Sequence, residues 1–319
     1  MIEMVEIIIG IDIGGTAVKI GFLNQQGDII HKWEIETNTE EQGKYIIDYI
    51  WSSVSNTLSQ FQISKILGIG IGAPGFVDKE TGIVREAVNI GWKNFELGRK
   101  LADLSGLPVF VENDVNLVAL GENWLGAGRN AKDLIAITLG TGVGGGIIAN
   151  GQILTGINGT AGEIGHIIAD PTGYSCNCGR IGCLDTIASA TGIVKQAMEK
   201  IVDNPGCKLD STYQKNGGII AKDVFDLAKE GDIICKSIIN RTADILGFMI
   251  ANAAMIINPS KIIIGGGVAK SGKQLLTPVT EAFEKYSLRD ISKQCKVEIA
   301  KLGNDAGIIG AAYLVKQEI

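Results

Sequence analysis

The chain contains 319 residues, of which 45% are hydrophobic, so a disordered protein and a small disulfide-stabilised scaffold are both excluded. At roughly 150 residues per domain, this length predicts about two domains. The formal net charge is −6 and no run of basic residues occurs, which argues against a nucleic-acid partner. Glycine is unusually common at 43 residues, and its clusters after apolar runs indicate loops where the backbone approaches a ligand.

The sequence predicts neither a secretory signal nor a membrane span. The first residues carry acids where a signal peptide would carry lysine or arginine. The longest apolar stretch, 245–257, is shorter than the roughly 20 residues that a span needs, and it contains Asn252. We therefore expect a cytoplasmic protein with no membrane partner. In that reducing compartment, clustered cysteines are more often metal ligands than disulfides.

The first half of the chain opens with a three-stranded meander whose first turn is rich in glycine. A buried strand at 7–11 runs into the turn at 12–16, and a second strand precedes a third that ends at Ile35. An apolar residue at every fourth position from Ile46 to Leu58 predicts a helix. The further predicted elements are strands at 66–71 and 109–111 and a helix at 115–125.

The second half repeats this opening pattern. A strand at 134–139 runs into a glycine-rich turn at 140–146 and continues into a hairpin through Asn150 and Gly151. The units at 7–23 and 134–154 therefore form an internal duplication. The remaining predicted elements are a helical region at about 186–257, strands at 261–264 and 297–302, and a final helix at about 305–317.

The duplication predicts two α/β domains. We place the first domain at 1–114 and the larger second domain at 115–304, with the terminal segment 305–319 packing back onto the first. Ligands gather where domains and strand ends meet, so we expect the functional site between the two domains.

The two glycine-rich turns stand at equivalent points of the duplicated unit and predict an anion site. Backbone N–H groups exposed by small residues bind phosphate oxygens. Thr16 and Thr141 add hydroxyl donors, and Lys19 adds a positive charge. Asp12, at the end of the first strand, is a candidate for holding Mg²⁺ through water. The alternative is that the glycines only form tight hairpins. This alternative is less favoured because the glycine-rich turn occurs twice, at equivalent points of the duplicated unit.

One histidine and three cysteines have metal-ligand spacing, in the pattern H-x9-C-x-C-x4-C formed by His166, Cys176, Cys178 and Cys183. Nitrogen and sulfur ligands that leave no open position predict a closed tetrahedral, structural Zn²⁺ site. The alternatives are a redox pair of Cys176 and Cys178, or free buried thiols. Metal binding would fix the imidazole tautomer, so that the other ring N–H can point at a ligand.

These motifs resemble a known family. The segments 12–16, 139–146 and 265–267 resemble the two phosphate loops and the adenosine loop of the superfamily of sugar kinases, actin and heat-shock ATPases. The segments 156–166 and 176–183 narrow the resemblance to the ROK family, over essentially the whole chain. Two further segments, 89–94 and 302–307, are most similar to the glucokinase branch from Gram-positive bacteria.

The resemblance implies an α/β protein with a two-domain, actin-like ATPase (ribonuclease H-like) sugar-kinase fold and an interdomain cleft. It implies an ATP-dependent hexokinase that transfers the γ-phosphoryl group to the 6-hydroxyl of glucose, with Mg²⁺, a structural Zn²⁺ and a homodimeric assembly. The residues expected to bind the nucleotide and its metal are Asp12, Gly14, Gly15, Thr16, Lys19, Thr141, Gly142, Gly266 and Gly267.

The resemblance also implies the sugar site, formed by Gly75, Asn113, Asp114, Glu163, His166 and Asp185. Asp114 is the expected general base, because transfer requires a carboxylate that takes the proton of the accepting hydroxyl. The sequence also allows Asp114 to be the N-cap of the helix at 115–125, and the two roles are compatible. Asp185 stands where the family usually carries Glu, so its reach is about one methylene shorter. Its alternative role is to cap a helix that begins near Thr186.

Two other functions are open at this point. The chain resembles kinases for other hexoses, such as fructose, mannose or an N-acetylhexosamine, and the sequence does not distinguish these acceptors. ROK repressors use the sugar site only to sense a sugar, and they carry a helix-turn-helix domain before the first phosphate loop. Only 11 residues precede Asp12, so the expectation is a kinase without that domain.

Overall fold

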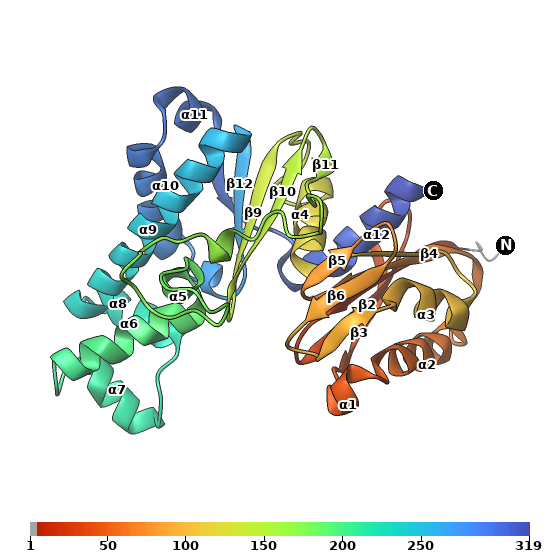
Figure 1. Ribbon diagram of the computed structural model, residues 1–319, viewed down its shortest axis with the longest axis horizontal. Helices are drawn as coiled ribbons and strands as arrows, with labels where there is room; N and C mark the ends of the chain where they lie inside the picture. Colours follow the sequence, from red (N-terminus) through yellow and green to blue (C-terminus); the bar gives the residue numbers. More distant parts are fainter. Residues whose placement is uncertain (1–4) are drawn as a thin grey trace.

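The computed structural model describes residues 5–319 and shows two α/β lobes (Figure 1). Each lobe contains a five-stranded mixed sheet and its own core of buried aliphatic side chains. A third core includes side chains of α4 (Asp114–Trp124), α12 (Ala306–Glu318) and both sheets, so these two helices join the lobes.

The first sheet has the strand order β3-β2-β1-β4-β8. The first three strands are antiparallel, and β4 and β8 run parallel to β1. Its strands are β1 (Val5–Ile13), β2 (Ala17–Leu23), β3 (Ile29–Glu36), β4 (Ile63–Ala73) and β8 (Val109–Asn113). The helices of this lobe are α1 (Glu40–Gly43), α2 (Ile46–Leu58) and α3 (Leu97–Ser105). Buried Ile46, Ile50 and Val54 form the apolar face that the sequence predicts for α2.

The second sheet repeats this order as β11-β10-β9-β12-β13, with the same strand directions. Positive φ angles of 53° at Asn150 and 80° at Gly151 form the predicted tight turn between β10 and β11. The predicted duplication is therefore confirmed in the topology. The strands are β9 (Leu134–Leu139), β10 (Val143–Ala149), β11 (Gln152–Ile153), β12 (Lys261–Gly265) and β13 (Lys296–Ile299).

Helices pack beside the second sheet. The longest of those in this lobe, α9, contributes many buried side chains to the core of the second lobe. The predicted helical region at 186–257 is confirmed, whereas α10 and α11 were not predicted. The helices are α5 (Asp185–Ala188), α6 (Ala190–Asp203), α7 (Lys208–Asn216), α8 (Ala221–Lys229), α9 (Ile233–Ile257), α10 (Lys273–Tyr286) and α11 (Arg289–Gln294). Short 3-10 turns are η1 (Ile164–His166), η2 (Val268–Ser271) and η3 (Gly303–Asp305).

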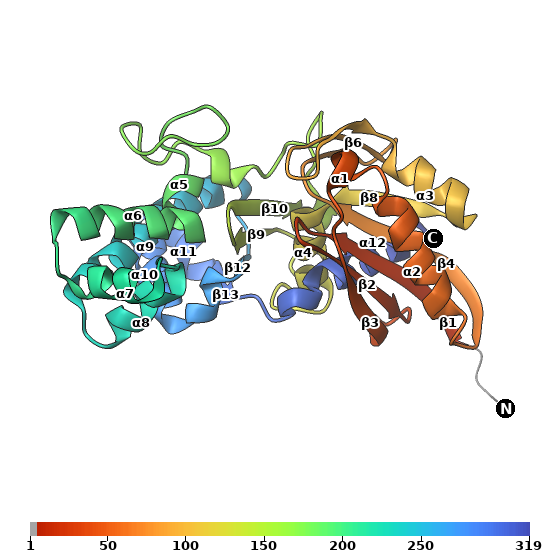
Figure 2. The same cartoon turned by 90° about the horizontal axis from the view of Figure 1, so that it is seen from below.

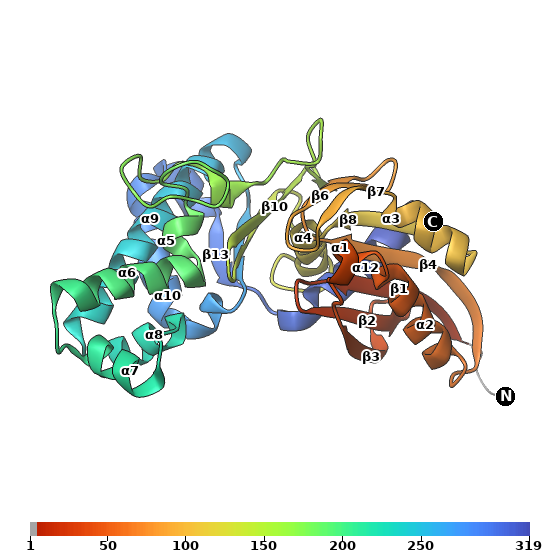
Figure 3. The same cartoon turned by 60° about the horizontal axis from the view of Figure 1, so that its bottom comes forward.

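A small antiparallel sheet on the first lobe was not predicted. It consists of β5 (Phe76–Asp78), β6 (Ile83–Ala87) and β7 (Trp92–Phe95), and it lies beside β8 (Figure 3). The rings of Trp92 and Phe95 stack with centroids 4.2 Å apart.

The terminal helix α12 lies against the first sheet. A methyl group on Gly10 or Gly70 would lie 2.3 Å or 2.0 Å from a backbone oxygen of α12, so the helix and the strands are in backbone contact. A methyl group on Gly310 would similarly lie 1.8 Å from the Leu117 oxygen of α4. Glycine therefore allows α12 to pack closely on both β1–β4 and α4, while the domain limits at 114 and 304 stay a prediction.

Across residues 5–319, the structure contains no helix with the length and apolar character needed to span a bilayer.

Candidate active site

Asp114 lies at the junction between β8 and α4, and α4 is one of the two helices that join the lobes. Asn113, rather than Asp114, is the N-cap of α4: its Oδ1 accepts hydrogen bonds from the N–H groups of Val115 at 2.9 Å and Asn116 at 3.1 Å. The alternative in which Asp114 is the N-cap of this helix is therefore wrong, because Asn113, with its extended backbone, occupies that position. Asp114 lies in the first turn, where its Oδ1 also accepts from Val115 at 2.9 Å.

Asn113 also connects Asp114 to another predicted sugar residue. Its Nδ2 donates a hydrogen bond to the Gly75 oxygen at 3.0 Å. Gly75 has a φ of 87°, and a methyl group there would lie 2.0 Å from the Glu86 oxygen, so only glycine suits this turn. The structure thus places Gly75, Asn113 and Asp114 side by side.

The pKa of the Asp114 carboxyl group is strongly raised. Burial raises the pKa of its carboxyl group to about 7, and the negative charges of Asp12 and Glu163 act in the same direction. The hydrogen bond from Val115 acts against this rise. A pKa near neutrality suits a group that must accept a proton and later release it.

Asp12 is the second carboxylate of the site. A methyl group on Gly72 would lie 3.6 Å from Asp12 Oδ1 and 3.5 Å from Asp114 Cα, so the two aspartates lie on either side of Gly72. Burial raises the pKa of Asp12, and the charge of Lys19 opposes that rise. Lys19 is the cross-strand partner of Asp12 in the β1–β2 hairpin. Two carboxylates this close together favour the binding of a cation between them, and Mg²⁺ is such a cation.

The first glycine-rich loop joins β1 to β2 and is held within its own sheet. Gly15 and Thr16 are exposed. Thr37 donates its hydroxyl to the Gly14 oxygen at 2.8 Å and its N–H to the Thr16 oxygen at 3.0 Å. Apart from the neighbouring residues, no atom of residues 5–319 lies within 4 Å of a methyl group placed on Gly15. This glycine therefore faces open space, as expected of a ligand-binding loop.

The second loop joins β9 to β10 at Gly140–Gly142, and a third follows β12 at Gly266–Gly267. Thr141 and Gly142 are exposed, and so are both glycines of the third loop. The Gly140 N–H donates to the Gly142 oxygen at 2.9 Å, which closes a tight turn. All predicted nucleotide residues therefore lie on the first strand pair or on these loops.

The glycines after this second loop have a different role. A methyl group on Gly144 or Gly146 would lie 2.6 Å or 2.8 Å from side chains of α4, and one on Gly145 would lie 2.3 Å from the Gly162 oxygen. The run at 144–146 therefore allows α4 and the segment before η1 to pack onto opposite faces of β10. Only the start of the predicted loop at 140–146 is left to meet a ligand.

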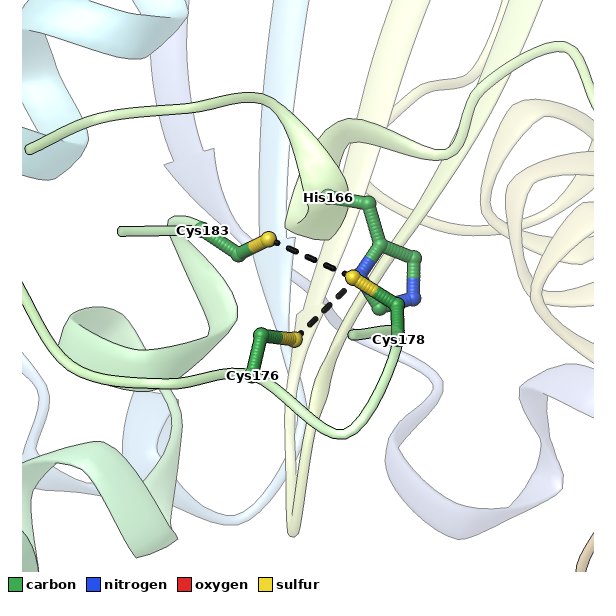
Figure 4. Close-up of side chains that lie close together, drawn as sticks. All are labelled: His166, Cys176, Cys178 and Cys183. Carbon is green, nitrogen blue, oxygen red and sulfur yellow. Dashed lines mark hydrogen bonds between the residues drawn. The ribbon is translucent and has the colours of Figure 1, made fainter. Parts of the chain in front are cut away.

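The predicted zinc ligands come together around one point (Figure 4). The ligand atoms of His166, Cys176, Cys178 and Cys183 all lie within 4.8 Å of one another. The Sγ atoms of Cys178 and Cys183 are 3.6 Å apart, and Cys176 Sγ lies 3.7 Å from His166 Nδ1. Zn–S bonds of about 2.3 Å in a tetrahedron give S–S separations of about 3.8 Å. The type and grouping of these ligand atoms therefore suit a tetrahedral zinc ion.

His166 connects this cluster to Glu163. Its Nδ1 faces the cysteines, which leaves Nε2 as the nitrogen available to a ligand. Glu163 precedes η1, and partial burial raises the pKa of its carboxyl group while the nearby His166 lowers it. The negative charge of Glu163 also raises the pKa of Asp114, so the two carboxyl groups interact although they come from different segments of the chain.

Asp185 lies at the start of α5, and its side chain is bound to the second loop. Its Oδ1 accepts a hydrogen bond from the Val143 N–H at 2.6 Å. Leu184 occupies the N-cap of α5, so the alternative in which Asp185 caps this helix is wrong. A contact between Asp185 and the sugar stays a prediction.

Sequence reasoning did not identify two residues that hold the loops. Thr37 supports the first loop, and Thr191 donates its hydroxyl to the Thr141 oxygen of the second at 2.8 Å. Both bind backbone oxygens that are distant in sequence, and a lone threonine in a loop or at the start of a helix carries no signal of such a contact.

Comparisons with known proteins identify the family. The profile described as ROK family matches residues 8–318. The chain belongs to the ROK family. It is 50% identical to a protein named glucokinase from Halalkalibacterium halodurans, over 97% of this chain and 95% of that protein.

Solved structures of the family have the same fold. The ROK family glucokinase from Streptomyces griseus, in complex with glucose and AMPPNP, matches with a TM-score of 0.80 and 34% identity, covering 98% of this chain and 99% of that one. The expected actin-like fold with an interdomain cleft is therefore confirmed. A ROK family transcriptional regulator, described as a homolog of the E. coli MLC protein, matches with a TM-score of 0.88 and 29% identity, covering 98% of this chain and 78% of the regulator. Fold similarity alone thus does not separate enzymes from regulators in this family.

Proposed function

We propose that this ATP-dependent sugar kinase transfers the γ-phosphoryl group of ATP to the 6-hydroxyl of glucose. The observation that carries the proposal is Asp114, a partly buried carboxyl group with a pKa of about 7, next to Asp12. The similarity to glucokinases, one of which was solved with glucose and AMPPNP, supports glucose as the acceptor.

The nucleotide would bind along the exposed loops of both lobes. Backbone N–H groups of Gly15 and Thr16 and of Thr141 and Gly142 are suited to the phosphates, and Gly266 and Gly267 to the adenosine. Lys19 offers a positive charge on the side of Asp12. Mg²⁺ held near Asp12 would neutralise the charge of the transferred phosphoryl group.

Asp114 would act as the general base. In its ionised form it accepts the proton of the 6-hydroxyl as the oxygen attacks the γ-phosphorus and the bond to the leaving ADP oxygen breaks. The capping bonds made by Asn113 fix the first turn of α4 and therefore the position of the carboxylate. This arrangement supplies positioning, which accounts for most of the catalysis in phosphoryl transfer.

The remaining sugar hydroxyls would be recognised from both lobes. Asn113 and the Gly75 backbone approach from the first lobe, and Glu163 and His166 from the second. A zinc ion bound by His166 and the three cysteines would fix the imidazole tautomer, so that Nε2–H donates to a sugar hydroxyl. The homodimer and the cytoplasmic location implied by the family stay predictions.

The proposal is tested by sugar-dependent ADP release with Mg-ATP and five acceptors: glucose, mannose, fructose, N-acetylglucosamine and N-acetylmannosamine. The expected result is the highest kcat/KM with glucose. A clear preference for another hexose would contradict the proposed acceptor and leave a kinase of different specificity. If none of the five sugars promoted ADP release, a sugar-sensing role like that of the family's regulators would be favoured instead.

A further inference from the structure

The second phosphate loop is held from outside by the segment 185–191. Three hydrogen bonds connect them, and each involves a different residue of the loop or of the strand that follows it. They run from Val143 N–H to Asp185 Oδ1 at 2.6 Å, from Ala190 N–H to the Gly140 oxygen at 2.8 Å, and from the Thr191 hydroxyl to the Thr141 oxygen at 2.8 Å.

Of these contacts, the Asp185 contact involves an ionisable side chain. A carboxylate that accepts from a backbone N–H forms a charge-assisted bond, which is stronger than a bond between neutral groups. Val143 is buried and directly follows the exposed residues Thr141 and Gly142. Fixing its N–H therefore fixes the end of the loop that presents donors to the phosphates.

Asp185 is itself held firmly. The Ser189 hydroxyl donates a hydrogen bond to the backbone oxygen of Asp185 at 2.6 Å. The Oγ of Ser189 in turn accepts a hydrogen bond from the Gly192 N–H at 2.9 Å. Thr186 and Ser189 are buried. The support therefore comes from a packed junction between α5 and α6 (Figure 2). In the sequence, α5 begins at Asp185, two residues after the cluster residue Cys183.

The space around the carboxylate suits Asp better than Glu. A methyl group on Gly142 would lie 2.8 Å from Asp185 Oδ1, so the carboxylate is already in close contact with the loop. A side chain longer by one methylene would have to fold back to place an oxygen at the same point beside Gly142 and Val143. Asp185, at the position where the resemblance implies Glu, reaches the Val143 N–H directly.

We propose that Asp185 is a positioning residue for the nucleotide, which orients the phosphate loop at 140–143 through its bond to Val143. This inference deepens the proposed function, because it assumes that the loop binds ATP. It predicts that changes at Asp185 act mainly on ATP affinity, whereas a sugar-binding role predicts an effect on sugar affinity.

The test compares Asp185→Ala, Asp185→Asn and Asp185→Glu with the wild-type protein. For Asp185→Ala we expect KM for Mg-ATP to rise roughly tenfold or more, as for the loss of a hydrogen bond to a charged group, with KM for glucose nearly unchanged. Asp185→Asn keeps an acceptor of the same shape, so its KM for Mg-ATP should rise less. Asp185→Glu should raise KM for Mg-ATP because the longer side chain displaces the loop.

Asp232→Ala is the matched control. Asp232 Oδ1 accepts the Cys235 N–H at 2.8 Å at the start of α9, so this variant loses the same type of bond elsewhere in the lobe. It should lower Tm and leave both KM values unchanged. Thr191→Val removes a second contact to the loop and should raise KM for Mg-ATP as well.

Binding of AMPPNP with Mg²⁺, measured by calorimetry without sugar, separates this inference from the proposed function. Weaker binding to Asp185→Ala supports the inference even if glucose is not the acceptor. A rise in KM for glucose with unchanged AMPPNP binding would overturn it and identify Asp185 as a sugar residue. Unchanged AMPPNP binding and KM values with a lower Tm would also overturn it, and would leave only a packing role.

Discussion

The two glycine-rich loops occupy equivalent places in equivalent sheets, yet they are supported differently. Thr37, just beyond β3 of the same sheet, holds the first loop at Gly14 and Thr16. The second loop is held by the start of α5 and α6, next to the cysteine and histidine cluster. Strand topology therefore determines where each glycine-rich loop lies, whereas segments outside the paired strands determine what keeps it in place.

The largest expected effect concerns Asp114, where the two halves meet. Asp114→Asn preserves the shape of the side chain but cannot take the proton, so kcat should fall about 10²–10⁴-fold while glucose still binds. Steady-state kinetics and glucose calorimetry check this. Retention of most of the wild-type kcat would mean that Asp114 only shapes the site.

The same variant has an expected effect on stability. Folding raises the pKa of Asp114 from 3.8 to about 7, so the ionised carboxylate opposes folding most strongly above pH 7. Asp114→Asn should therefore melt at a higher temperature than the wild type at pH 8, and the difference should shrink as the pH falls to 5. A difference that did not change with pH would contradict the burial of this charge.

The next effect tests whether the second loop depends on the cluster. Cys178→Ser should release zinc and raise KM for glucose roughly tenfold or more, because His166 loses its fixed orientation. Since Asp185 follows the cluster closely, KM for Mg-ATP should rise as well. Elemental analysis, Tm and both KM values check this. Full activity of a wild-type protein that contains no zinc would show that the metal is not needed for sugar binding or catalysis.

A pair of glycine variants sharpens the comparison between the loops. Gly15→Ala meets open space, so it should weaken ATP binding several-fold with little change in Tm, by blocking the approach of phosphate. Gly142→Ala would also press on Asp185 Oδ1, and should therefore affect both ATP binding and Tm. Equal changes in Tm for the two variants would contradict the difference in support.

The smallest effect is a shift in pH dependence. Because the base must be ionised, kcat/KM for glucose should rise with pH and level off above about 7. Glu163→Gln removes a charge that raises the pKa of Asp114, so it should move the midpoint to a lower pH. A midpoint that is unchanged in this variant would show that the two acids do not interact.

Much of this arrangement could be predicted from the sequence, because its signals are local and repeated. Apolar runs that end in glycine marked both loops, and the cysteine spacing marked the cluster. The small sheet at 76–95 was not predicted, because its strands are short and have no clear alternation. The contacts of Asn113 and Asp185 could not be predicted either. Both side chains bind backbone N–H groups, and which N–H group lies nearby depends on the tertiary structure.

³¹P NMR of the reaction product tests most directly whether the protein phosphorylates glucose at its 6-hydroxyl. Glucose and Mg-ATP with the wild-type protein should give a phosphate monoester whose phosphorus couples to the two protons on C6. Asp114→Asn under the same conditions should give little of this product. A phosphorus coupled to the proton on C1, or no sugar phosphate at all, would contradict phosphoryl transfer to the 6-hydroxyl of glucose.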